Sequence, residues 1–221
     1  MTYKAVIFDL DGTLVNSLED LARSANAVLE HLGLPTHDIP SYAYRVGNGI
    51  RALMERSLPE GRVDLLEDAL ALFREEYAAR QLVHTAPYKG IRELLDGLRE
   101  RGIRLAVCTN KHEEAAMQIV ERLFGSGLFE VVAGDLPGRE RKPCPDTVLS
   151  IAARWGLLPE EIVYAGDSGV DMETAVRAGM LPAGVLWGFR GAEELRACGA
   201  AVLLQKPADL WSVWERETKG A

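Results

Sequence analysis

Acidic, basic, amide and hydroxyl side chains stand at four distant points of the sequence, each directly after an apolar run or in the loop that follows one. They are Asp9, Asp11, Thr109, Asn110, Lys142, Asp167 and Asp171. Clustered carboxylates repel one another unless a cation is present, and Mg²⁺ prefers oxygen ligands. A carboxylate can also attack phosphorus to form an aspartyl-phosphate, whose phosphoryl oxygens need donors and positive charge nearby. The set therefore indicates phosphoryl transfer at a magnesium site.

These side chains can meet only if a fold brings several strand ends together. Short apolar runs predict buried strands at 4–8, 103–108, 130–133, 162–165, 182–186 and 201–204. Helical patterns at 91–101, 112–123, 146–155 and 171–178 separate most of them. This alternation predicts an α/β core with a Rossmann-like, doubly wound parallel sheet covered on both faces, over residues 1–15 and 85–221. Ligands bind such sheets at the carboxyl ends of the strands.

Residues 16–84 break the alternation and predict an all-helical insert. Apolar residues recur at helical spacing over 18–32, about 50–57 and 62–80, and no convincing strand occurs in 36–88. Ser17 is the expected N-cap of the first of these helices, and Asp20 stands three residues later as in a capping box.

Length and composition limit the classes of protein that the chain can belong to. A chain of 221 residues suits one core plus one smaller insert. The formal net charge of −8, from 25 basic and 33 acidic residues, argues against a nucleic-acid partner. No apolar run approaches a membrane span, and the first residues lack a signal-peptide layout. Three cysteines without a CxxC motif indicate a reducing compartment, so we expect a cytoplasmic protein.

Four segments together resemble the haloacid dehalogenase-like phosphohydrolases. They are DLDGTL at 9–14, TNK at 109–111, KPCP at 142–145 and GDSGVD at 166–171, in the order and spacing of that family. The resemblance implies an Mg²⁺-dependent phosphomonoesterase that acts on a small phosphorylated metabolite. It also implies that the helical insert is a cap that closes over the site.

The resemblance further implies a role for each core residue. Asp9 is expected to be the nucleophile, and Asp11 the general acid and then the general base. The carboxylates of Asp9 and Asp167 and the backbone carbonyl of Asp11 are expected to bind Mg²⁺. Asp171 is expected to support the metal, directly or through water. Lys142 is expected to neutralise the nucleophile and the phosphoryl oxygens.

The phosphate and the rest of the substrate also have expected binding groups. Thr109 and the backbone N–H of Asn110 are expected to hold the phosphate. The insert segment around Gly47, Asn48 and Gly49 is similar to the cap of phosphoglycolate phosphatases. Two glycines let backbone N–H groups approach an anion, such as the carboxylate of 2-phosphoglycolate. A simple turn between two helices is the alternative for this segment, and a monomer or a homodimer is expected.

Other activities of the same fold fit the sequence less well. A phosphonate hydrolase of this family uses a cap lysine, and residues 15–88 contain none. A haloacid dehalogenase lacks the second aspartate, whereas Asp11 is present. Thr13 is more typical of phosphatases than of β-phosphoglucomutase-like enzymes. A non-catalytic binding module would have lost Asp9 or Asp11. Pyrophosphatase and sugar-phosphate phosphatase activities stay open.

Overall fold

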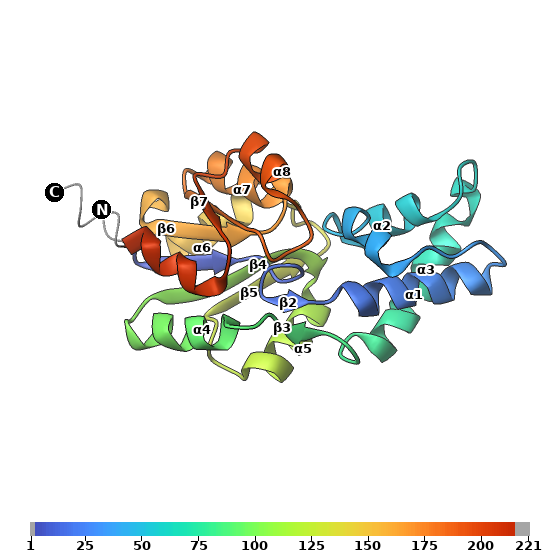
Figure 1. Cartoon of the computed structure of the whole chain (residues 1–221), viewed down its shortest axis with the longest axis horizontal. Helices are drawn as coiled ribbons and strands as arrows, with labels where there is room; N and C mark the ends of the chain where they lie inside the picture. The colour runs from blue at the N-terminus through green and yellow to red at the C-terminus, as the bar shows by residue number, and fades with distance from the viewer. Residues whose placement is uncertain (1–2, 215–221) are drawn as a thin grey trace.

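A six-stranded parallel sheet forms the centre of the computed structural model, which describes residues 3–214 (Figure 1). Its strands, in spatial order, are β5 (Val131–Asp135), β4 (Arg104–His112), β1 (Ala5–Phe8), β6 (Ile162–Gly166), β7 (Leu181–Val185) and β8 (Val202–Leu204). The chain builds outward from β1 first on one side and then on the other, so the sheet is doubly wound. This topology confirms the predicted Rossmann-like core.

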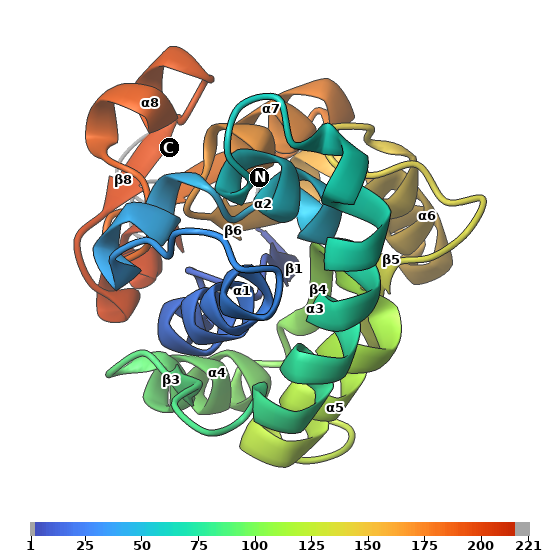
Figure 2. The same cartoon turned by 90° about the vertical axis from the view of Figure 1, so that its right-hand side faces the viewer.

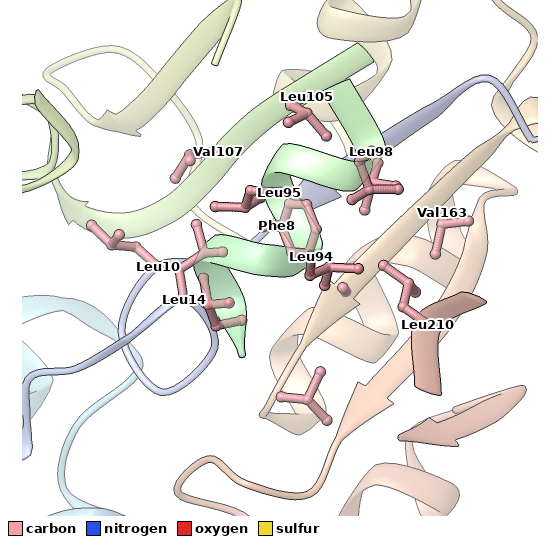
Figure 3. Close-up of a cluster of buried hydrophobic side chains, with 14 of the residues drawn as sticks. Phe8, Leu10, Leu14, Leu94, Leu95, Leu98, Leu105, Val107, Val163 and Leu210 are labelled. Carbon is pink, nitrogen blue, oxygen red and sulfur yellow. The ribbon is translucent and has the colours of Figure 1, made fainter. Parts of the chain in front are cut away.

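Helices cover both faces of the sheet because alternate strand residues point to opposite sides. Val6 and Phe8 of β1 enter one apolar cluster, while Ala5 and Ile7 enter another. The first cluster includes residues of α4 (Ile91–Glu100) and α5 (Glu113–Phe124), and Figure 3 shows Phe8 beside the leucines of α4. The second includes residues of α6 (Asp146–Trp155) and α7 (Gly169–Ala178). A short helix, α8 (Ala192–Ala197), lies between β7 and β8.

The helices of the predicted insert pack around an apolar cluster of their own. They are α1 (Leu18–His31), the 3₁₀ helix η1 (Ile39–Tyr44), α2 (Gly49–Ser57) and α3 (Leu66–Arg80). The short 3₁₀ helix η2 (Val63–Leu65) lies between α2 and α3 in the chain and contributes no residue to the cluster. In Figure 1 they lie to the right of the sheet, and Figure 2 looks onto them. They contact the core at the carboxyl ends of the strands. Within residues 3–214, none of the helices has the length and apolar composition of a membrane-spanning segment.

Two short strands join these helices to the core, and they correct one sequence prediction. β2 (Val15–Asn16) pairs antiparallel with β3 (Ala86–Pro87), although no strand was expected within 36–88. The two connecting segments lie side by side, so their backbone groups pair with each other. Such a two-residue pairing leaves no alternating pattern in the sequence.

The predicted capping box at the start of α1 is wrong. Ser17 occupies the N-cap position, but its hydroxyl donates to Asp11 Oδ1 at 2.6 Å and makes no capping bond. The Asp20 carboxylate accepts from the backbone N–H groups of His84 and Thr85 instead. Both side chains therefore bond to distant residues instead of capping the helix. These bonds connect the beginning of α1 to the loop at Asp11 and to the segment at His84 and Thr85.

Three of the remaining boundaries matter for the site. β4 continues to His112, beyond the expected end at 108, so Thr109, Asn110 and Lys111 belong to the strand. α7 begins at Gly169, two residues before the expected start. The predicted helix 62–80 divides into η2 and α3. The outer ends of the expected core ranges, residues 1–2 and 215–221, lie outside the described residues.

Candidate active site

Three buried carboxylates meet at the carboxyl end of the sheet. Asp9 follows β1, Asp167 follows β6, and Asp171 lies in the first turn of α7. β1 and β6 are neighbouring parallel strands, so their ends lie together. One oxygen from each carboxylate lies within 4.8 Å of the others. The arrangement concentrates negative charge around one point.

The buried ammonium of Lys142 lies against this cluster. Its Nζ is 2.9 Å from Asp9 Oδ1 and 2.6 Å from Asp171 Oδ1. The Asn110 side chain holds the Lys142 backbone: its Oδ1 accepts from the Lys142 N–H at 2.9 Å and its Nδ2 donates to the Lys142 carbonyl at 3.2 Å. Asn110 therefore positions Lys142, a role that the sequence did not indicate for its side chain.

Two glycines allow the chain to pass close to Asp167. A Cβ on Gly12 would lie 2.3 Å from Asp167 Oδ2, and one on Gly188 would lie 2.3 Å from Asp167 Cβ. Gly12 also has φ +85°, a conformation that favours glycine. The Asp167 carboxylate accepts from Thr13 Oγ1 at 3.2 Å and from the Phe189 backbone N–H at 2.8 Å. Gly188 and Phe189 were missed because the loop after β7 matches none of the quoted segments.

Both oxygens of Asp171 already have protein partners. Its Oδ1 faces Lys142 and accepts from the Tyr164 hydroxyl at 3.3 Å. Its Oδ2 accepts from the backbone N–H and the hydroxyl of Ser168, at 3.0 and 2.6 Å. Asp171 is thus both a helix-capping residue and a member of the charged cluster. These bonds hold the carboxylate in one orientation.

The electrostatics of the cluster suit a cation. Burial raises the pKa of Asp9 to about 7, with help from Asp171 and against the effect of Lys142. Burial, followed by the charges of Asp171 and Asp9, also raises the pKa of Asp167 well above its usual value. A divalent cation among the carboxylates would offset both effects. The donor atoms are carboxylate oxygens, which are the ligands that Mg²⁺ takes.

Asp11 is separate from the three-carboxylate cluster and has its own lysine. Lys111 Nζ lies 3.0 and 2.9 Å from the two oxygens of Asp11, and 4.6 Å from the centre of the Tyr77 ring. Burial opposes the charged form of Lys111, but the interactions with Asp11 and Tyr77 together outweigh burial and raise its pKa. The sequence segment 109–111 contained Lys111, yet its type and position gave it no role.

A small cavity of about 70 Å³ separates these core residues from the helical insert. The core residues on its wall include Asp9, Asp11, Thr109, Asn110 and Lys111, and the insert residues include Gly47, Gly49, Ile50, Leu53 and Tyr77. Asn48 does not line the cavity, and its amide lies beside Arg56. The structure therefore brings two of the three predicted insert residues to the cavity and directs the third away from it.

Arg190 connects the core to the insert beside this cavity. Its guanidinium donates to the carbonyl oxygens of Ala43 and Val46, the latter at 3.0 Å, and lies over the Tyr44 ring. The neighbouring residue Phe189 donates to Asp167, so one loop touches both the carboxylate cluster and the insert. No spacing in the sequence indicated this contact, because it joins segments about 145 residues apart.

The doubly wound sheet and the cluster of buried carboxylates at its carboxyl end are the features expected of a haloacid dehalogenase-like hydrolase, and comparison with known families gives the same class. The model of the haloacid dehalogenase-like hydrolases matches residues 6–185, and the chain belongs to this family. This result confirms the resemblance seen in the sequence.

Named relatives narrow the class. The phosphoglycolate phosphatase of Aquifex aeolicus (strain VF5) is 34% identical over 207 residues, which cover 94% of both chains. That of Chromobacterium violaceum is 35% identical over 215 residues, or 95% of this chain and 96% of the relative. The chain is therefore a phosphatase enzyme of this family, similar to phosphoglycolate phosphatases.

Solved structures of similar proteins have the same fold. The crystal structure of a protein from Lactobacillus delbrueckii subsp. bulgaricus, assigned by inference as a phosphoglycolate phosphatase, superposes with a TM-score of 0.90 at 30% identity. The match covers 96% of this chain and 98% of that one. CbbY from Rhodobacter sphaeroides in complex with phosphate has a TM-score of 0.76 at 25% identity, covering 95% and 96% of the two chains.

Proposed function

We propose that the protein is an Mg²⁺-dependent phosphomonoesterase that hydrolyses 2-phosphoglycolate through an aspartyl-phosphate. The observation that carries this proposal is the position of Asp9. Its carboxylate lies at the cavity wall, in an ion pair with Lys142 and beside two further carboxylates. The names of the relatives support the choice of substrate.

The proposed reaction has two displacement steps at phosphorus. An Asp9 oxygen attacks the phosphorus, the bond to the ester oxygen breaks, and the carboxyl group of Asp11, in its protonated form, gives a proton to the leaving alkoxide. Asp11 then takes a proton from water, whose oxygen attacks the phosphorus and releases phosphate from Asp9. Lys142 balances the charge of the nucleophile, and Thr109 and Asn110 lie where they can contact the phosphate.

Mg²⁺ supplies charge neutralisation of the phosphoryl oxygens when it is bound. Asp9 and Asp167, with the backbone carbonyl of Asp11, are the proposed ligands. Asp171 has both oxygens engaged by Lys142, Tyr164 and Ser168. This favours an indirect role for Asp171, in which it orients Lys142 and holds charge near the metal.

The helical insert, residues 16–84, is the proposed cap. Its Gly47, Gly49 and Tyr77 form the wall of the cavity opposite Asp9. A wall of this kind limits the substrate to a small group beyond the phosphate and excludes water from the reacting atoms.

A panel of phosphorylated metabolites tests the proposal. The wild-type protein and the Asp9→Asn variant are assayed with Mg²⁺ and with a chelator, on 2-phosphoglycolate, pyrophosphate and glucose phosphates. We expect a preference for 2-phosphoglycolate, loss of turnover in chelator, and a fall of about 10⁴-fold or more in Asp9→Asn, because the nucleophile is removed.

The folded state of the variant is checked by its circular dichroism, and deamidation back to Asp by mass spectrometry. Normal hydrolysis by a verified Asp9→Asn protein would rule out the mechanism. A preference for pyrophosphate or a glucose phosphate would keep the enzyme class and replace the substrate.

A further inference from the structure

Lys111 has a position that the proposed reaction does not use. Among the described residues 3–214, it is the one lysine or arginine on the wall of the cavity between core and insert. Lys142, in contrast, faces Asp9 and Asp171 and does not line the cavity. The Lys111 side chain is only 6% exposed, so its charge acts in surroundings with little water. A buried ammonium at a cavity wall is a strong group for binding an anion.

The positions of Asp9, Asp11 and Lys111 along the cavity indicate which anionic group of the substrate Lys111 would bind. The phosphorus atom is bound at Asp9, and the ester oxygen must lie at Asp11, which donates its proton. Lys111 contacts both oxygens of Asp11 at 3.0 and 2.9 Å. A substrate group in contact with Lys111 therefore lies about one carbon atom beyond the ester oxygen. An ammonium has three N–H donors, and its contacts with the two Asp11 oxygens use at most two of them, so one remains to bind a second anion.

We infer that Lys111 is the residue that selects the substrate, by binding a carboxylate one carbon away from the ester oxygen. This inference rests on the proposed phosphatase function and deepens it. The backbone groups of Gly47 and Gly49 then complete the wall without supplying the charge. Tyr77 covers Lys111 from the insert, with its ring centre 4.6 Å from Nζ, and keeps water from the ion pair.

The experiment compares two substrates that differ in the carboxylate: 2-phosphoglycolate and 2-hydroxyethyl phosphate. The measured quantity is the kcat/KM for 2-phosphoglycolate divided by the kcat/KM for 2-hydroxyethyl phosphate. A loss of activity that is the same on both substrates leaves this ratio unchanged and reports only the disturbance of Asp11. We expect the ratio to fall about 10- to 100-fold in Lys111→Met, mainly through the KM for 2-phosphoglycolate, since a hydrogen bond to a charged group is lost. Lys111→Arg should keep most of the preference.

Arg74→Gln is the matched control, because Arg74 lies on α3 in an adjoining depression that shares Tyr77 with the cavity. Its ratio should equal that of the wild type. An equal loss on both substrates in Lys111→Met would overturn the inference and leave Lys111 a positioning residue for Asp11. A wild-type enzyme that hydrolyses both substrates equally would overturn it as well. Hydrolysis of neither would instead overturn the proposed function itself.

A second measurement needs no variant. Inhibition of the wild-type protein by 3-phosphonopropionate is compared with inhibition by propylphosphonate, which lacks the carboxylate. We expect the first compound to inhibit at least about tenfold more tightly. Equal inhibition by the two would contradict a carboxylate-binding role for Lys111.

Discussion

The charged cluster beneath the cavity and the insert-facing wall of the cavity are built in different ways. In this cluster, called the floor below, only Asp9 reaches the cavity itself. Lys142, Asp167 and Asp171 lie behind it, and each has two or more partners, all supplied by the core. At the other wall, insert groups such as Gly47 and Tyr77 meet the core through single contacts with Asn110 and Lys111. This difference indicates a division of function between the two regions. The densely bonded core groups hold the reacting atoms, and the few contacts across the cavity determine substrate specificity. Substitutions on the two sides of the cavity test this division.

Among the variants that test this division, Lys142→Met is expected to have the largest effect, because it removes the cation of the floor. Asp9 and Asp171 would lose the cation between them, although Asp171 would keep its bonds to Tyr164 and Ser168, and the phosphoryl oxygens would lose nearby positive charge. We expect kcat to fall about 10³-fold on every substrate, with a lower melting temperature in chelator. Steady-state kinetics on 2-phosphoglycolate and 2-hydroxyethyl phosphate check this. The exposed Lys89→Met is the control, and a substrate-selective loss in Lys142→Met would contradict the division.

Gly188→Ala tests how closely the floor is packed. The new Cβ would lie 2.3 Å from Asp167 Cβ and 2.4 Å from the Gly12 carbonyl oxygen, so the loop or the carboxylate must move. Overpacking of this kind costs about 1–3 kcal/mol. We expect the Mg²⁺ concentration for half-maximal activity to rise about tenfold.

The matched control is Gly191→Ala, three residues further on, where a Cβ meets nothing within 4 Å. Titration of activity with Mg²⁺ distinguishes the two variants. An unchanged Mg²⁺ requirement in Gly188→Ala would show that Asp167 does not need this close approach.

Arg190→Met tests the contact between the core and the insert. It removes the hydrogen bonds to the carbonyl oxygens of Ala43 and Val46 while leaving the floor residues in place. We expect KM for 2-phosphoglycolate to rise about tenfold and kcat to change less, because bonds to a charged donor contribute about 1.5–3 kcal/mol. Arg62→Met removes an exposed ion pair with Asp64 and should change neither. A fall in kcat alone would contradict the prediction.

The smallest effect is a pH dependence of stabilisation by Mg²⁺. The pKa of Asp9 is raised from 3.8 to about 7 in the folded chain. In chelator, its protonated form contributes stability that is fully present below pH 3.8 and is lost as the pH rises through about 7. Mg²⁺ binds the ionised form, so it should raise the melting temperature by a few degrees more at pH 8 than at pH 5.5.

Thermal unfolding at the two pH values, with Mg²⁺ and with chelator, measures this difference. Asp9→Asn serves as the control and should show a smaller dependence on pH. Equal stabilisation by Mg²⁺ at both pH values in the wild-type protein would show that Asp9 does not couple the metal to the proton.

Local sequence patterns predicted the helices and strands of the core well and the segments that connect the core to the insert poorly. The apolar run of β1 and the amphipathic pattern of α6 each carry their own signal within a few residues, and both elements form where expected. Ser17 has the same local pattern as a helix cap, yet its hydroxyl bonds to Asp11. Competition between a local and a distant partner depends on which groups the fold brings near, and that information is spread along the whole chain.

Strand periodicity and residue chemistry are local properties, so the amino-acid sequence alone predicted the α/β core and the charged residues that follow its strands. The folded structure was needed to place Lys142 between Asp9 and Asp171, Lys111 against Asp11 under Tyr77, and Arg190 against the insert. These contacts join residues far apart in the chain. Their distances follow from how helices and sheet pack, which no spacing in the sequence records.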